Sequence, residues 1–137
     1  MTSPETRAAK MPVGQEPTLR VVPEPADVNF MGDVFGGRIM SQVDVAGGIP
    51  ALRHCGGRVV TVAVNAFAFR QPVFVGDIVS FYTRIARVGR TSVTVDVEVY
   101  AQRHFSEHDI VKVTEATLTY VALDDNRRPR PISPLPR

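Results

Sequence analysis

The stretch GRIMSQVDVAGGIPALRHC, residues 37–55, decides the fold, because it is the only long segment of the chain with a helical pattern. Its middle is apolar on nearly every side, which favours a helix that is buried over one on the surface. Gly47, Gly48 and Pro50 are poor helix formers, so we expect a kink or shifted hydrogen bonding at Pro50. Glycines at the centre of a helix also permit another backbone to approach it closely.

A single carboxylate stands out in this helix. Asp44 is the only charged residue in the ten residues from Val43 to Leu52. Burying an ionised carboxylate without a partner costs on the order of several kcal/mol, which packing alone does not repay. We therefore expect Asp44 to take part in chemistry. The structural alternative is a buried carboxylate that is held by a backbone amide or an arginine.

Strand patterns lie on both sides of the helix. They cover residues 18–22, 58–69, 78–88, 91–100 and 110–121. Residues 58–69 are apolar on both faces, which favours a central strand. Residues 91–100 alternate between valine and mostly polar residues, as in a half-buried antiparallel strand, and Gly89-Arg90 before them is typical of a hairpin turn. A polar turn around residues 106–109 precedes the last strand.

The order of these elements predicts an α+β fold, in which one long helix packs on one face of an antiparallel sheet. Such a sheet leaves edges to cover, so we expect self-association. The folded domain is expected at residues 17–123. Residues 1–16 form a flexible N-terminal tail and residues 124–137 an irregular tail rich in proline and arginine.

Composition narrows the class of protein. The 137 residues suit one domain, and no apolar run approaches the roughly 18–20 residues that span a bilayer, so we expect no membrane partner. Four arginines lie in the last eleven residues, and removing them from the net charge of +2 leaves −2, which does not favour nucleic acid as a partner. The N-terminus is polar and unlike a secretory signal. Because the single Cys55 excludes an intramolecular disulfide, a cytoplasmic location is expected.

Five blocks in the same order carry a resemblance to a known family. The first is NFMGDVFGG at residues 29–37 with MSQVD at 40–44; the others are RVVTV at 58–62, Pro72 to Asp77, Thr91 to Val93, and Thr114 to Val121. Over about residues 18–132 the chain resembles the hotdog-fold acyl-CoA thioesterases of the bacterial YciA type. Two departures stand out: Phe35 occupies a position where many relatives carry histidine, and Pro50 interrupts a helix that usually continues smoothly.

The resemblance implies a hotdog fold, in which the antiparallel sheet wraps around the central helix. It implies a homo-oligomer, a dimer of hotdogs that assembles to a tetramer or hexamer, with active sites at the dimer interface. The implied reaction is hydrolysis of acyl-CoA to a free carboxylic acid and coenzyme A. No cofactor or metal is implied, since coenzyme A is part of the small-molecule substrate. Asn29 and Asp44 match the catalytic residues and come from different protomers.

The residue types suit this chemistry. Gly36-Gly37 at the helix N-terminus would present backbone N–H groups to a thioester oxygen. Asp44 would act as a general base on water or as a nucleophile, and both routes stay open. Asn29 would orient the water or polarise the thioester. Further residues are candidates for binding the coenzyme A phosphates, because guanidinium and hydroxyl groups donate to phosphate: Arg58, Arg70, Arg90, Thr91 and Ser92.

Two other functions compete with the thioesterase. A non-catalytic acyl-CoA-binding protein of the same fold is the first alternative, and retention of both Asn29 and Asp44 disfavours it. A hotdog dehydratase or hydratase would need a histidine near the helix, and residues 23–53 contain none. The three histidines, His54, His104 and His108, have no spacing typical of a metal site.

Overall fold

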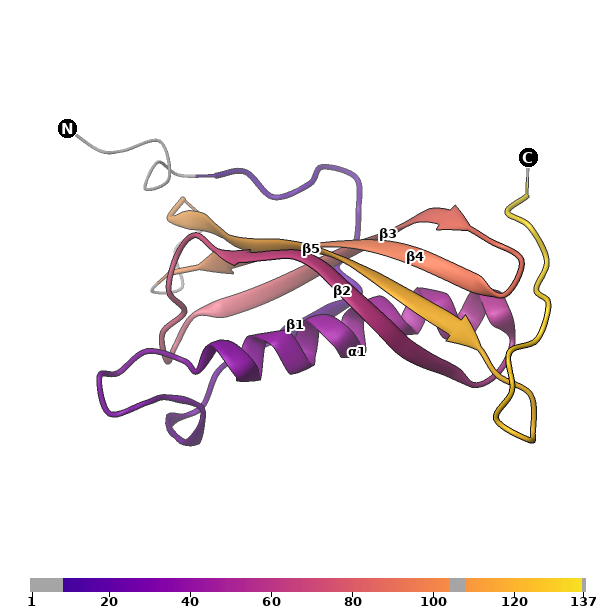
Figure 1. Cartoon of the computed structure of the whole chain (residues 1–137). Helices are drawn as coiled ribbons and strands as arrows, with labels where there is room; N and C mark the ends of the chain where they lie inside the picture. The colour runs from indigo at the N-terminus through magenta and orange to yellow at the C-terminus, as the bar shows by residue number, and fades with distance from the viewer. Residues whose placement is uncertain (1–8, 104–107, 137) are drawn as a thin grey trace.

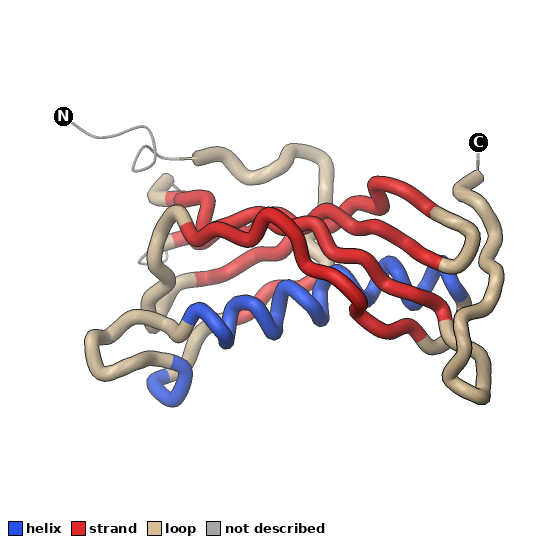
Figure 2. Tube along the Cα trace, viewed as in Figure 1, coloured by secondary structure: helices blue, strands red, loops and turns tan. Residues whose placement is uncertain are grey.

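One long helix lies against a curled antiparallel sheet in the computed structural model, which describes residues 9–103 and 108–136 (Figures 1 and 2). The helix is α1 (Gly36–Cys55), and a short 3-10 turn, η2 (Pro25–Asp27), precedes it. The strands are β1 (Leu19–Val21), β2 (Val59–Phe69), β3 (Ile78–Val88), β4 (Ser92–Gln102) and β5 (Ile110–Ala122). The predicted α+β layout is therefore confirmed. Of the predicted turn at 106–109, residues 106 and 107 lie outside the described residues.

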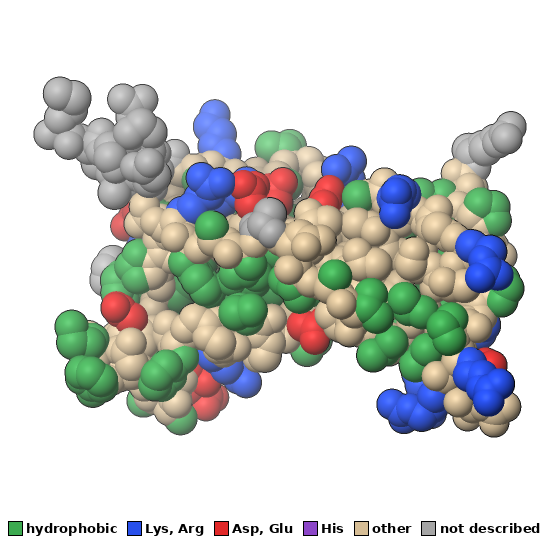
Figure 3. All heavy atoms as spheres, viewed as in Figure 1, with side chains coloured by type: hydrophobic (Ala, Val, Ile, Leu, Met, Phe, Trp, Pro, Cys, Tyr) green, Lys and Arg blue, Asp and Glu red, His purple; other side chains and the backbone are tan. Residues whose placement is uncertain are grey.

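The sheet order is β1-β3-β4-β5-β2, and every neighbouring pair is antiparallel. This order places β2 at an edge, so the prediction that residues 58–69 form a central strand is wrong for a single protomer. The apolar character of its second face has another cause: Val60, Val62 and Val64 are 39%, 56% and 42% exposed. Figure 3 shows hydrophobic side chains gathered over β2 and the adjoining part of α1. An exposed apolar row beside a free edge is typical of a surface that another chain covers.

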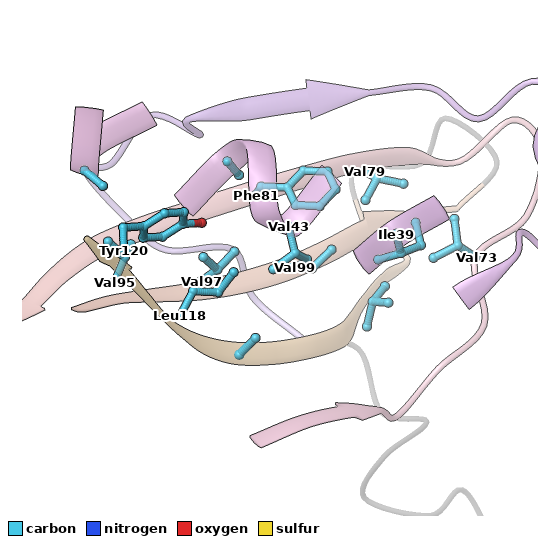
Figure 4. Close-up of a cluster of buried hydrophobic side chains, with 14 of the residues drawn as sticks. Ile39, Val43, Val73, Val79, Phe81, Val95, Val97, Val99, Leu118 and Tyr120 are labelled. Atoms are coloured by element: carbon cyan, nitrogen blue, oxygen red, sulfur yellow. The ribbon is translucent and has the colours of Figure 1, made fainter. Parts of the chain in front are cut away.

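The core forms where α1 crosses the concave side of the sheet (Figure 4). Ile39 and Val43 of α1 are each 1% exposed, and they face strand valines that are fully buried. The alternation of Val93, Val95, Val97 and Val99 places all four in this layer, as the sequence predicted. Burial of α1 along this layer is what brings Asp44 next to the sheet.

The helix continues past Pro50 to Cys55, where Gly56 ends it in the left-handed region at φ 68° and donates its N–H to the carbonyl oxygen of Leu52. Pro50 lacks the N–H that would bond the carbonyl of Ala46, so one helical hydrogen bond is missing while the helical path is kept. No helix among the described residues is long and apolar enough to cross a membrane.

Segments outside the central elements also contact the sheet. The N–H of Ala9 donates to the carbonyl of Ile110 over 2.7 Å, so residues 9–18 run along the sheet. At the other end, Arg130 donates to the carbonyls of Leu123 and Cys55, at 3.1 and 2.7 Å. The division into a domain at 17–123 and two tails stays a prediction, with the second tail packed against the end of α1.

Candidate active site

Asp44 lies in the middle of α1 and turns toward β2 and β5. Its Oδ1 accepts a hydrogen bond of 2.6 Å from Thr61 Oγ1. The hydroxyl of Tyr120 donates to the backbone carbonyl of Asp44 at 2.8 Å and lies 3.2 Å from Oδ1. Thr61 and Tyr120 are cross-strand neighbours, which is why both reach the same carboxylate. Among the described residues no arginine or backbone amide holds Asp44, so its partners are hydroxyl groups.

Tyr120 is a reliable donor to Asp44. Its burial raises the pKa of the phenol well above its ordinary value, and the neighbouring Asp44 charge and the hydrogen bond to that carboxylate raise it further. The phenol therefore stays protonated throughout the neutral pH range. Only one carboxylate oxygen is engaged in this way, since Oδ2 accepts no hydrogen bond from the part of the chain that the structure describes.

Gly47 explains how the phenol reaches the helix backbone. A Cβ at this position would lie 2.6 Å from the Tyr120 hydroxyl oxygen, whereas a Cβ on Gly48 would be 3.6 Å from the nearest ring atom. Within one protomer, the central glycines thus admit a tyrosine side chain. The close approach needs a residue without a side chain at position 47.

A mainly apolar pocket of about 350 Å³ opens beside Asp44. Thr61 and Tyr120 form its floor with Val59, and one face of α1 forms its wall: Val45, Gly48, Ile49, Leu52 and Arg53. A free carboxylate oxygen beside an apolar pocket suits a substrate with a hydrocarbon part and an electrophilic centre.

Asn29 occupies a second pocket, of about 400 Å³, which it shares with Gly36 and Arg70. Its Oδ1 accepts from the backbone N–H groups of Met31 at 2.9 Å and Asp33 at 3.2 Å. The side-chain carbonyl oxygen of Asn29 therefore stabilises the loop and is not available to a ligand. The Asn29 amide nitrogen makes no hydrogen bond to the residues that the structure describes, so it remains a donor for a ligand.

Gly36 and Gly37 begin α1, and Gly36 lines the same pocket. The first N–H groups of a helix have no intrahelical acceptor, which leaves them for a ligand oxygen. A Cβ on Gly36 would meet the Phe69 ring at 3.1 Å, while the space around Gly37 is open. The helix start is fixed by an ion pair of 3.1 Å between Arg38 and Asp27.

A single protomer does not bring the two predicted groups together. Asp44 follows Gly36 by eight residues, which corresponds to roughly 12 Å along α1. Asn29, Gly36 and Arg70 line one pocket, and Asp44 lines the other. One reacting carbonyl needs both sets within about 3 Å.

The candidate phosphate-binding residues also separate into two places. Backbone hydrogen bonds join the carbonyls of Arg58, Arg90 and Thr91 to the chain at residues 122–132, at the end of the sheet where β2 begins. Ser92 lies in the same turn, where its carbonyl accepts from Gly89 at 2.7 Å. Arg70 follows the far end of β2, pairs with Glu115 at 2.7 Å and sits in the Asn29 pocket.

Comparison with known proteins agrees with this geometry. Residues 31–104 match the family described as the thioesterase superfamily. The acyl-CoA thioester hydrolase YciA of Escherichia coli (strain K12) is 46% identical over 114 residues, covering 82% of this chain and 86% of that protein. YciA of Salmonella typhimurium is 44% identical over 119 residues, covering 85% and 90%.

Solved structures of thioesterases also match this chain. HI0827, a hexameric broad specificity acyl-coenzyme A thioesterase, matches with a TM-score of 0.80 and 44% identity, over 85% of this chain and 80% of that one. The hexameric thioesterase y2039 of Yersinia pestis matches with a TM-score of 0.82 and 43% identity, over 90% and 98%. Cj0915 of Campylobacter jejuni, a hexameric hotdog fold thioesterase, has a TM-score of 0.81 and 44% identity, over 87% and 91%.

A sheet curled around one helix, with these matches, defines the class as the hotdog-fold thioesterases, and the predicted hotdog fold is confirmed. Within that class, the chain belongs to the family of YciA-type acyl-CoA thioester hydrolases.

Sequence reasoning did not select Thr61, Tyr120 or Arg53. Thr61 and Tyr120 both lie in blocks that carry the family resemblance, yet nothing in a single sequence tells which strand residue faces a helical carboxylate. The strand register supplies that information, because it places Thr61 opposite Tyr120 on the face covered by α1. Arg53 also lines the Asp44 pocket. It comes nine residues after Asp44, half a turn away in the helical period, so the period alone would not place it there.

Proposed function

We propose that the protein hydrolyses acyl-CoA thioesters to a carboxylic acid and coenzyme A, with Asp44 acting at the reacting carbon. One observation carries this proposal: the Asp44 carboxylate is held through Oδ1 and leaves Oδ2 free beside an apolar pocket. An acyl chain fits the apolar wall, and the thioester carbonyl then lies next to the free oxygen.

The complete site draws on two protomers. Asn29, Gly36 and Gly37 of one copy supply the donors for the carbonyl oxygen, and Asp44 of the other copy supplies the carboxylate. The separation of roughly 12 Å along one helix supports this arrangement. Phosphate binding follows the same division, with Arg58, Arg90, Thr91 and Ser92 on one protomer and Arg70 on its partner.

In the proposed reaction, Oδ2 of Asp44 takes a proton from water as the water oxygen attacks the carbonyl carbon. The carbonyl oxygen gains negative charge, which Asn29 and the Gly37 N–H stabilise. The C–S bond then breaks, and coenzyme A leaves as a thiol with the proton from Asp44. The alternative is direct attack by Asp44 to form an anhydride that water then hydrolyses. Single turnover in ¹⁸O-labelled water tests the second route, because label enters Asp44 only if an anhydride forms and water then attacks its Asp44 carbonyl carbon. Trapping of an acylated Asp44 detects the anhydride if water attacks the acyl carbon instead.

The reaction as proposed needs no resident cofactor or metal. Within the described part of the chain, no three His, Cys, Asp or Glu residues are grouped to hold a metal ion. Activity should therefore survive dialysis against a chelator. We also place the reaction in the cytoplasm, where a single reduced Cys55 is compatible with the environment.

HI0827, y2039 and Cj0915 are hexameric, and we propose a hexamer for this protein too. We further propose that the hexamer is built from dimers. The free edge of β2 and its exposed valines support pairing between sheets of two copies. Such pairing would make β2 a central strand of the joined sheet.

The test is release of free thiol from acyl-CoA substrates with acyl chains of increasing length. Asp44→Asn keeps the shape and removes the base, so turnover should fall to background while the oligomer stays intact. Full turnover in this variant would refute the proposed role of Asp44. Substrate binding without turnover in the wild-type protein would instead favour the non-catalytic acyl-CoA-binding alternative.

A mixing experiment tests the shared site. Asn29→Ala and Asp44→Ala proteins are each expected to be inactive. After subunit exchange, a mixed dimer holds one site with both residues intact, so part of the activity should return. Absence of rescue, with exchange verified by mass spectrometry of tagged subunits, would show that both residues act within one protomer.

A further inference from the structure

Among residues 9–103 and 108–136, Tyr120 is the one buried side chain that hydrogen-bonds both the main chain and the side chain of Asp44. It is 2% exposed and reaches α1 from β5 (Figure 4). Its hydroxyl lies 2.8 Å from the Asp44 carbonyl oxygen and 3.2 Å from Oδ1. A donor that bridges these two atoms fixes the carboxylate relative to its own backbone, which a bond to the side chain alone does not do.

We propose that Tyr120 is the positioning residue of Asp44, and that Gly47 is glycine because the Tyr120 hydroxyl must pass that point of the helix. This inference rests on the proposed role of Asp44 in thioester hydrolysis. The Tyr120 hydroxyl does not contact the reacting carbonyl in this proposal. It holds Oδ1 against the sheet, together with Thr61, so that Oδ2 points to the pocket.

The presence of glycine at position 47 supports this assignment, because glycine destabilises a helix interior. Glycine in a helix interior is about 1 kcal/mol less favourable than alanine. At position 47 alanine is excluded by one contact, 2.6 Å from its Cβ to the Tyr120 hydroxyl oxygen, while the two ring carbons next to it lie at 3.4 Å. The Tyr120 hydroxyl group, rather than its ring, therefore requires glycine at position 47. A tyrosine that only filled the core would not need its hydroxyl there.

These contacts give a double-mutant cycle. Tyr120→Phe removes the hydroxyl and keeps the ring, whereas Gly47→Ala keeps the hydroxyl and displaces it. Each change should lower kcat by roughly 10- to 100-fold, the effect of one hydrogen bond to a charged group, with KM changed about twofold or less. In the double variant the clash is absent, so Gly47→Ala should cause no further loss once Tyr120 is Phe.

The split between kcat and KM separates positioning from packing. Loss of the donor leaves Oδ1 less well fixed, so Tyr120→Phe should lower kcat while KM stays nearly unchanged. Tyr100→Phe is the matched control, because Tyr100 is also a buried tyrosine that donates to a carboxylate, at 2.6 Å to Glu98, away from the Asp44 pocket. It should leave both kcat and KM unchanged.

The results distinguish this inference from the proposed function. Wild-type kcat in Tyr120→Phe, or independent losses in Gly47→Ala and Tyr120→Phe, would overturn the positioning role while Asp44→Asn remained inactive. Activity in Asp44→Asn would overturn the proposed function itself. If Tyr120→Phe does not assemble, Gly47→Ala is used alone to test the positioning role. A change confined to KM in Gly47→Ala would contradict that role.

Discussion

Arg103 offers a sharp test of how the chain holds the loop beside the Asn29 pocket. Its guanidinium pairs with Asp77, donates to the Pro72 carbonyl at 2.8 Å and lies 4.6 Å from the centre of the Phe74 ring. The Asp77 carboxylate also accepts from the Phe74 N–H at 2.9 Å. The two charged side chains are only 9% and 3% exposed. Arg103→Met leaves Asp77 as a buried charge without its ion-pair partner.

The expected loss of unfolding free energy is roughly 3–5 kcal/mol, the cost of removing one partner from a buried ion pair. For a chain of this length, that loss lowers Tm by roughly 10–20 °C. Urea unfolding followed by circular dichroism measures it as a shift of the midpoint at constant slope. Adding Asp77→Asn to Arg103→Met removes the stranded charge and should restore part of the loss.

Arg84→Met is the matched control, because Arg84 also forms an ion pair with an aspartate, at 2.8 Å to Asp96, but its side chain is 76% exposed. Pairs of this kind contribute about 0–1 kcal/mol. Equal unfolding midpoints for Arg103→Met and Arg84→Met would refute the reasoning, since a buried pair with further contacts should contribute more than an exposed pair.

Two further outcomes are expected. Burial raises the pKa of the Cys55 thiol, with a smaller opposing effect of Arg130, so less thiolate is present at a given pH. The native protein should therefore react with an aromatic disulfide reagent roughly tenfold or more slowly than the urea-unfolded chain. Equal rates would contradict burial of the thiol. Val62→Glu should weaken the oligomer in light scattering, because Val62 borders the free edge of β2, whereas Val22→Glu, at the same 56% exposure beyond the opposite edge, should not. An intact hexamer in Val62→Glu would place the interface elsewhere.

The helix and the strands were predictable because their patterns are local. The helix predicted at 37–55 is observed at Gly36–Cys55, and the strand predicted at 78–88 is observed at Ile78–Val88. Period and turn residues are written into short windows of sequence, so they need no knowledge of distant contacts. The unusual charge of Asp44 was visible for the same reason.

The place of β2 and the partners of Asp44 were not predictable, because both depend on which strands meet. An apolar second face indicates a covered strand, but it does not tell whether the cover comes from the same chain or from another copy. Thr61 and Tyr120 are 59 residues apart in sequence and meet through the β2–β5 register alone. The partners of Arg58 and Arg70 differ for a similar reason, since the length of β2 carries them to opposite ends of the sheet.

The position of Asp44 along α1 links the fold to the assembly. The helix N-terminus offers donors for a developing oxyanion, and the carboxylate lies roughly 12 Å further along the same helix. If two copies pair about a two-fold axis with their helices antiparallel, the start of each helix comes near the middle of the other. A two-fold contact repeats itself, so each dimer gains two identical sites. We therefore expect activity to disappear at the concentration where the dimer dissociates, before the protomer unfolds.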